Sequence, residues 1–203
     1  MDAAHEDSPP RRERLIEVAP GCRLNVIEEG AESAAAGSTL VFLHALGTDS
    51  SIWRSQREHF RATHRVVCID APGHGQSPSW PELTLRAFSA AVWRVADDLE
   101  IARLTFVGTS MGAVVALDAA LQQPDRVDLA VLCGARLVRN DAQAHDLHCR
   151  SSSALHGDLE QVAQAMVDRG SRRPPRCRRL FANPSAPWCC AHRRRPMPPA
   201  PRP

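Results

Sequence analysis

Two short segments near the N-terminus alternate apolar and polar residues around a turn signal. The segments are 14–19 and 23–29, and Pro20 and Gly21 lie between them. Alternation with a period of two places the apolar side chains on one face of a strand. A Pro-Gly pair is typical of a turn. The pattern therefore predicts an N-terminal β-hairpin.

Four later runs are almost entirely apolar, which is typical of strands that are buried on both faces. These runs are 39–43, 65–69, 104–107 and 127–133. Segments compatible with helices lie at 51–62, 83–99, 110–122 and 158–168. The alternation of strand and helix predicts an α/β domain in three layers, with a mostly parallel sheet that helices cover on both faces.

The sequence GTSMG, from Gly108 to Gly112, falls between a predicted strand and a predicted helix. In a sharp strand-to-helix turn the serine hydroxyl projects from the backbone, and the positions two before and two after it need very small side chains. Gly108 and Gly112 meet that need. Ser110 is therefore the candidate nucleophile, and the amide of Met111 is a candidate oxyanion donor because it begins the helix. The alternative is a glycine-rich turn with an incidental serine.

Two other loops follow predicted strands. In FLHALGTDSSIW, residues 42–53, the amide of Leu46 is the candidate for the second oxyanion donor. In DAPGHGQS, residues 70–77, the glycines permit a compact turn. We interpret His44 and His74 as histidines that fix these loops rather than as proton carriers.

Taken in order, the HxLG loop, D-x-P-G-H-G-x-S, V-G-x-S-M-G and P-D-R-V resemble the α/β-hydrolase superfamily. Within it, LGTDSSIW, GHGQS and GTSMGA are most similar to 3-oxoadipate enol-lactonases and related esterases. The resemblance covers residues 14–135 best. It implies a small ester or lactone substrate, a serine nucleophile, an acid after a later strand, a histidine after the last strand, a helical cap and no cofactor. Ala45 and Ala113 stand where many members have glycine.

The resemblance requires two more strands after residue 133, and the pattern predicts none. We therefore expect an incomplete sheet whose last strands are missing, and the acid and histidine of the triad stay unidentified. The side chains of suitable type, which we interpret as loop residues, are Asp141, His145, Asp146, His148, His156 and His192. A zinc site is not predicted, because the spacing of the nearby ligand types matches no common pattern; these are Cys177, Cys189, Cys190 and His192.

Charge divides the chain sharply near residue 169. Residues 1–168 carry 15 arginines and all 23 acidic residues, whereas 169–203 carry ten arginines, no acidic residue and nine of the 16 prolines. Such a composition cannot form a packed core. We predict a flexible N-terminus at 1–13, an α/β-hydrolase core with the start of a cap at 14–168, and a disordered Arg/Pro-rich tail at 169–203.

One hypothesis for the tail is a shifted reading frame. The chain contains arginine but no lysine, and it has no tyrosine. That usage is typical of a GC-rich coding sequence, and such DNA yields Arg, Pro, Ala and Cys when it is read out of frame. Reading the other two frames of the coding DNA beyond Val162 tests this hypothesis.

The sequence is compatible with three functions. The first is ester or lactone hydrolysis through Ser110, and the second is an inactive chain of the same fold that lacks its base. The third is a protein whose basic tail binds nucleic acid or an anionic surface through charge, without a motif for specific recognition. For activity of the chain as written, the pattern favours the second.

The sequence also indicates where the protein works. No run approaches the ~18–20 apolar residues of a membrane span, and the N-terminus has no apolar export segment. The seven cysteines are odd in number. These features favour a cytoplasmic protein with reduced thiols.

Overall fold

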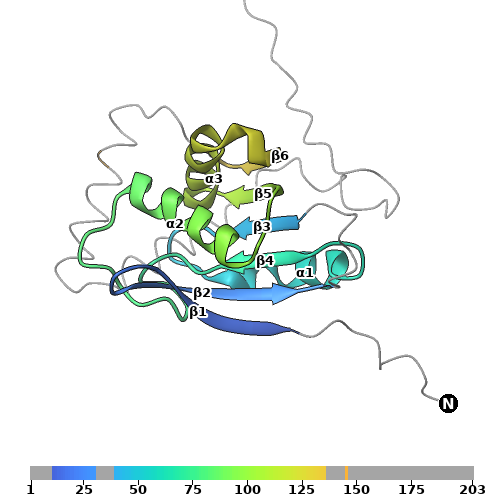
Figure 1. Ribbon diagram of the computed structural model, residues 1–203, viewed down its shortest axis with the longest axis horizontal. Coiled ribbons are helices and arrows are strands. Elements are labelled where there is room, and N and C mark those ends of the chain that lie inside the picture. The colour runs from blue at the N-terminus through green and yellow to red at the C-terminus, as the bar shows by residue number, and fades with distance from the viewer. Residues whose placement is uncertain (1–10, 31–38, 136–144, 146–203) are drawn as a thin grey trace, which may run out of the picture. The chain divides into compact units, whose positions relative to one another are not determined.

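The structure is a computed structural model, and it describes residues 11–30, 39–135 and 145. The described strands form a six-stranded sheet in the order β1-β2-β4-β3-β5-β6 (Figure 1). Their bounds are β1 (Arg12–Ala19), β2 (Cys22–Glu29), β3 (Thr39–Leu43), β4 (Val66–Ile69), β5 (Leu104–Thr109) and β6 (Val127–Cys133). The predicted α/β class and each strand predicted from the sequence are confirmed, with ends that differ by at most two residues.

The sheet is mixed in direction. Strand β1 pairs antiparallel with β2, and β2 pairs antiparallel with β4. The remaining neighbours, from β4 through β3 and β5 to β6, are parallel. The N-terminal hairpin and the mostly parallel sheet are therefore both as predicted. Because parallel strands point the same way, the loops that leave their carboxyl ends meet at one edge.

The described helices are α1 (Arg54–Phe60), α2 (Leu85–Asp98) and α3 (Met111–Gln122), with short 3-10 turns η2 (Ser50–Trp53) and η3 (Pro124–Arg126). The helix predicted at 51–62 is thus a 3-10 turn followed by a short α-helix. The helix predicted at 83–99 begins later because Thr84 is its cap, with a side chain that accepts a hydrogen bond from the Ala87 amide at 3.1 Å. The predicted helix at 158–168, the predicted absence of later strands and the tail at 169–203 lie outside the described residues.

Helices cover the two faces of the sheet, with α2 and α3 on one side and α1 on the other (Figure 1). Strand β3 shows the division clearly. Val41 and Leu43 join the cluster that α2 and α3 complete, whereas Leu40 and Phe42 join a smaller cluster with Trp53. The alternation of side chains along a strand produces this division.

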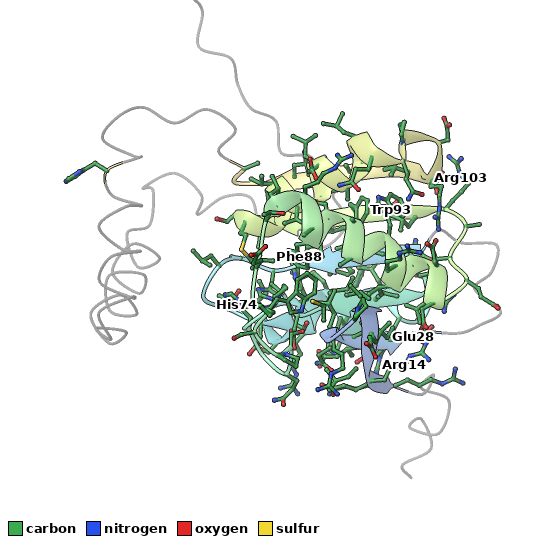
Figure 2. All side chains as sticks on the ribbon, turned by 60° about the vertical axis from the view of Figure 1, so that its left-hand side comes forward. Arg14, Glu28, His74, Phe88, Trp93 and Arg103 are labelled. Carbon is green, nitrogen blue, oxygen red and sulfur yellow. The ribbon has the colours of Figure 1, made fainter. Side chains whose placement is uncertain are left out.

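Trp93 connects α2 with α3 and β5, the two elements that flank the candidate nucleophile. Its indole Nε1 donates a hydrogen bond to the Ala119 carbonyl of α3 at 2.9 Å, and its ring packs edge-on against Phe106 of β5 (Figure 2). The guanidinium of Arg126 lies 4.8 Å from the ring centroid. These contacts fix α3 against β5, so the turn between them has a defined geometry.

Candidate active site

Ser110 occupies the turn between β5 and α3. Its φ is 51° and its ψ is −112°, which is a strained conformation for a residue with a side chain. The amide of Ser110 donates to the Cys133 carbonyl at the end of β6 at 2.8 Å, and its carbonyl accepts from the Val114 amide at 3.3 Å. The residue is exposed. The helix therefore begins at Met111, one residue later than predicted, because the φ of Ser110 is not helical.

The two glycines of this turn lie where no side chain fits. A Cβ atom at Gly108 would lie 2.5 Å from the Gly112 carbonyl oxygen and 2.7 Å from the Ala113 Cα. A Cβ at Gly112 would lie 2.6 Å from the His44 carbonyl oxygen and would meet the Leu43 carbonyl even more closely. The first turn of α3 therefore packs directly against the end of β3. We call residues 108–112 the elbow.

The start of α3 supplies free backbone donors. Ser110 makes no side-chain cap to the helix, and the first amides of any α-helix have no partner within the helix. Their partial positive charge favours an anion beside the N-terminus. A negative charge that develops next to Ser110 would therefore lie near the amide of Met111.

Leu46 lies in the loop that follows β3, and the residue is 42% exposed. Leu43, the last residue of β3, pairs in register with Gly108 of β5. Both chains therefore leave the sheet at neighbouring points, and the elbow and residues 44–49 lie at the same edge. We call residues 44–49 the oxyanion loop.

His44 is almost fully buried, and both of its ring nitrogens have partners. Nδ1 donates to the Ala45 carbonyl at 2.8 Å, and Nε2 accepts from the Ala71 amide at 2.8 Å. Burial lowers the pKa of His44, although the hydrogen bond to Ala45 opposes this. His44 therefore connects the oxyanion loop with the loop after β4, which favours its interpretation as a loop-fixing residue.

Asp70 directly follows β4, and the sequence pattern does not predict a functional role for it. Its carboxylate accepts hydrogen bonds from the Ser50 amide at 2.8 Å, the Asn25 side chain at 3.0 Å and the Gln76 amide at 3.1 Å. Burial raises the pKa of Asp70, but the hydrogen bonds from Ser50, Asn25 and Gln76 outweigh it and hold that pKa below its ordinary value. The signal in the sequence is an acid placed directly after an apolar strand.

The other candidates are only partly covered by the structure. His145 is described and exposed. The remaining triad candidates and zinc-ligand types lie outside the described residues: Asp141, Asp146, His148, His156, Cys177, Cys189, Cys190 and His192. Within residues 11–30, 39–135 and 145, no group of three or more His, Cys, Asp or Glu side chains is arranged to hold a metal ion.

A cavity of about 580 Å³ is lined by residues of α1 and of neighbouring segments, among them Asp49 and Asp70, and by no residue of the elbow. Charged side chains dominate its lining, and among them Arg57 and Glu29 form a buried ion pair with an N–O distance of 2.8 Å. Neither Ser110 nor Leu46 lines it. We therefore do not assign this cavity to the chemistry of Ser110.

Comparison with known proteins identifies the class. Residues 38–184 match the family model of the alpha/beta hydrolase fold, and the chain belongs to that family. No described helix is long and apolar enough to cross a membrane.

Particular relatives include two proteins named 3-oxoadipate enol-lactonase from Acinetobacter baylyi. One is 37% identical over 52% of this chain, and the other is 30% identical over 64%. The chain spans only 39% and 48% of their lengths. The crystal structure of an enol-lactonase from Burkholderia xenovorans LB400 is 26% identical, has a TM-score of 0.66, and is matched over 78% of this chain and 58% of that one.

Proposed function

We propose that this chain derives from a hydrolase of carboxylic esters or lactones in which Ser110 is the nucleophile. The observation that supports this most strongly is the elbow. A residue with a side chain is held at a φ of 51°, and steric contacts demand glycine on both sides of it. Strain of this kind costs about 1–3 kcal/mol and is concentrated at functional sites.

In the proposed reaction the Ser110 hydroxyl attacks the carbonyl carbon, and its proton passes to a base. The carbonyl oxygen becomes negative, and the amides of Met111 and Leu46 donate hydrogen bonds to it. A single such donor is worth about 3 kcal/mol or more in the transition state. The leaving oxygen takes the proton from the base, and water then releases the acyl group from Ser110. These steps need no cofactor.

The proposed reaction also needs a proton acceptor beside Ser110. No described side chain is hydrogen-bonded to the Ser110 hydroxyl, and His44 and His74 use their ring nitrogens for backbone groups. A serine without a base is a poor nucleophile. The second candidate, which the sequence pattern favours, is a chain that retains the fold and the serine but turns over slowly or not at all.

For the substrate we propose a small lactone or ester, with 3-oxoadipate enol-lactone as the first compound to assay. The names of the relatives support this choice. We also propose a cytoplasmic location, which rests on the sequence features alone.

The test is covalent capture by a fluorophosphonate probe, followed by mapping of the labelled peptide by mass spectrometry. We expect label on Ser110 in the wild type and none there in Ser110→Ala. The matched control is Ser55→Ala, because Ser55 is an exposed serine on α1. The probe should label Ser110 in Ser55→Ala to the same extent as in the wild type.

Turnover of p-nitrophenyl acetate and of 3-oxoadipate enol-lactone is measured on the same three proteins. The proposal predicts that turnover depends on Ser110. A folded wild type that neither labels nor exceeds Ser110→Ala in turnover overturns it and favours the inactive chain. Folding is checked by cooperative unfolding in urea.

A further inference from the structure

Two loops at the carboxyl edge of the sheet exchange histidine contacts. One is the oxyanion loop, and the other, residues 70–77, is called the GHG loop below. His44 of the oxyanion loop accepts a hydrogen bond from the Ala71 amide of the GHG loop at 2.8 Å. In return, His74 of the GHG loop accepts from the Gly47 amide of the oxyanion loop at 3.1 Å (His74 is labelled in Figure 2). The two contacts are reciprocal.

The opposite nitrogen of each ring binds a carbonyl oxygen. Nδ1 of His44 donates to Ala45 at 2.8 Å, and Nδ1 of His74 donates to Pro72 at 3.0 Å. Each ring therefore uses one donor and one acceptor, which is the pattern of the neutral imidazole with its proton on Nδ1. A ring protonated on Nε2 would direct an N–H at another N–H and lose the link between the loops.

These contacts bracket one residue of the proposed site. Ala45 precedes Leu46 and Gly47 follows it, so the backbone is restrained on both sides of the amide assigned to the oxyanion. The His44 and His74 ring centroids are 5.4 Å apart, so the rings are adjacent. Gly47 has a φ of 75°, so the chain turns sharply at the point where His74 holds it.

We propose that His44 and His74 are positioning residues that form a reciprocal clamp and hold the amide of Leu46 toward the Ser110 hydroxyl. This inference rests on the proposed function, and it adds two side chains that act through the backbone and not on the substrate. An oxyanion donor is effective only when it is fixed before the charge develops.

The kinetic test compares His74→Leu with His74→Gln. Leucine removes the acceptor for the Gly47 amide, whereas the Gln side-chain oxygen keeps an acceptor near the place of Nε2. We expect His74→Leu to slow Ser110 labelling and kcat by about 10-fold with little change in KM, since a displaced donor costs less than a deleted one. His74→Gln should recover most of that rate.

The matched control is His59→Leu, because His59 is an exposed histidine on α1. It should leave the labelling rate unchanged. Equal rates in wild type and His74→Leu, or equal losses in His74→Leu and His74→Gln, overturn the clamp. A loss of rate that is matched by loss of cooperative unfolding is a folding defect, and then the NMR measurement decides.

That measurement does not depend on activity. Nitrogen-15 NMR of the wild type should show both rings neutral with the proton on Nδ1 near pH 7.5. The Gly47 amide should exchange with solvent about 10-fold faster in His74→Leu. A proton on Nε2 of either ring, or unchanged exchange at Gly47, overturns the clamp. If Ser110 never labels while both NMR results hold, the proposed function fails and the clamp stands as a structural link between the loops.

Discussion

The elbow and the oxyanion loop lie side by side at one edge of the sheet, yet different forces hold them. The elbow depends on the absence of side chains, because Cβ atoms at Gly108 or Gly112 would overlap backbone atoms of neighbouring segments. The oxyanion loop depends on polar side chains. His74 accepts from its Gly47 amide, His44 donates to its Ala45 carbonyl, and Asp70 accepts from the amide of Ser50, which directly follows the loop. The elbow should therefore be destabilised by added side-chain volume. The oxyanion loop should be destabilised by the loss of a charged side chain or by protonation of a histidine.

The largest expected effect is at Gly112. Gly112→Ala places a methyl group against the carbonyls of Leu43 and His44. Leu43 is the last residue of β3, which lies inside the sheet, and His44 directly follows it. We expect the free energy of unfolding to fall by about 3 kcal/mol, the upper part of the range for overpacking. Urea denaturation measures the change.

Gly21→Ala is the matched control for this substitution. Gly21 has a φ of 70° but nothing within 4 Å of an added Cβ, so it tests backbone strain without overlap. We expect a loss of about 1 kcal/mol there. Equal losses of stability in Gly112→Ala and Gly21→Ala would mean that steric overlap with neighbouring backbone is not what requires glycine in the elbow.

The second-largest expected effect on the free energy of unfolding is at Asp70, whose carboxylate binds the amides of Ser50 and Gln76. Asp70→Asn replaces an acceptor of several hydrogen bonds with a group that is partly a donor, and it leaves buried donors at Ser50 or Asn25 unpaired. We expect a loss of about 2 kcal/mol at pH 7, measured by urea denaturation. Asp125→Asn, at an exposed acid, should change stability by less than about 0.5 kcal/mol.

Acid should reduce the difference between wild type and Asp70→Asn. The pKa of Asp70 is lowered in the folded protein. Its charge therefore stabilises the fold above the unfolded pKa, which is about 3.9, and that contribution is lost as the pH falls through the folded pKa. A difference that stays constant down to pH 2 would show that the carboxylate charge is not what holds the loop.

The third expected effect on stability is smaller and is at Ser110, in the elbow. Ser110→Gly removes the penalty for a side chain at a φ of 51°, whereas Ser110→Ala keeps it. Relief of strain is worth about 1–3 kcal/mol, and the added freedom of the unfolded glycine cancels about 0.5–1 kcal/mol of that. We expect Ser110→Gly to be the more stable variant by about 1 kcal/mol in urea denaturation. The reverse order would mean that the turn is not strained.

The same contrast explains what could be predicted from the sequence. The apolar runs predicted the strands and their parallel direction, and the spacing of Gly108 and Gly112 around Ser110 predicted the elbow, because both are local patterns. The partners of Asp70 could not be predicted in this way. Asn25 and Ser50 lie 45 and 20 residues from it in the chain, and only the sheet order brings them together. Reciprocal pairing of His44 and His74 depends on the same long-range order.

The last prediction concerns the sign of a pH effect at His44. The pKa of this buried ring is lowered, so the unfolded chain takes up the proton first as the pH falls below about 6.5. Stability should therefore decrease from that pH down to the folded pKa and then level off. The ionisable groups that act on the ring are His74, Asp70 and Asp49. His44→Asn should remove this part of the pH dependence and leave the separate loss below about pH 4 that belongs to Asp70. If the stability of the wild type instead rises between pH 6.5 and 5, His44 is charged in the folded protein. The neutral ring that we assign to His44 in the oxyanion loop is then wrong.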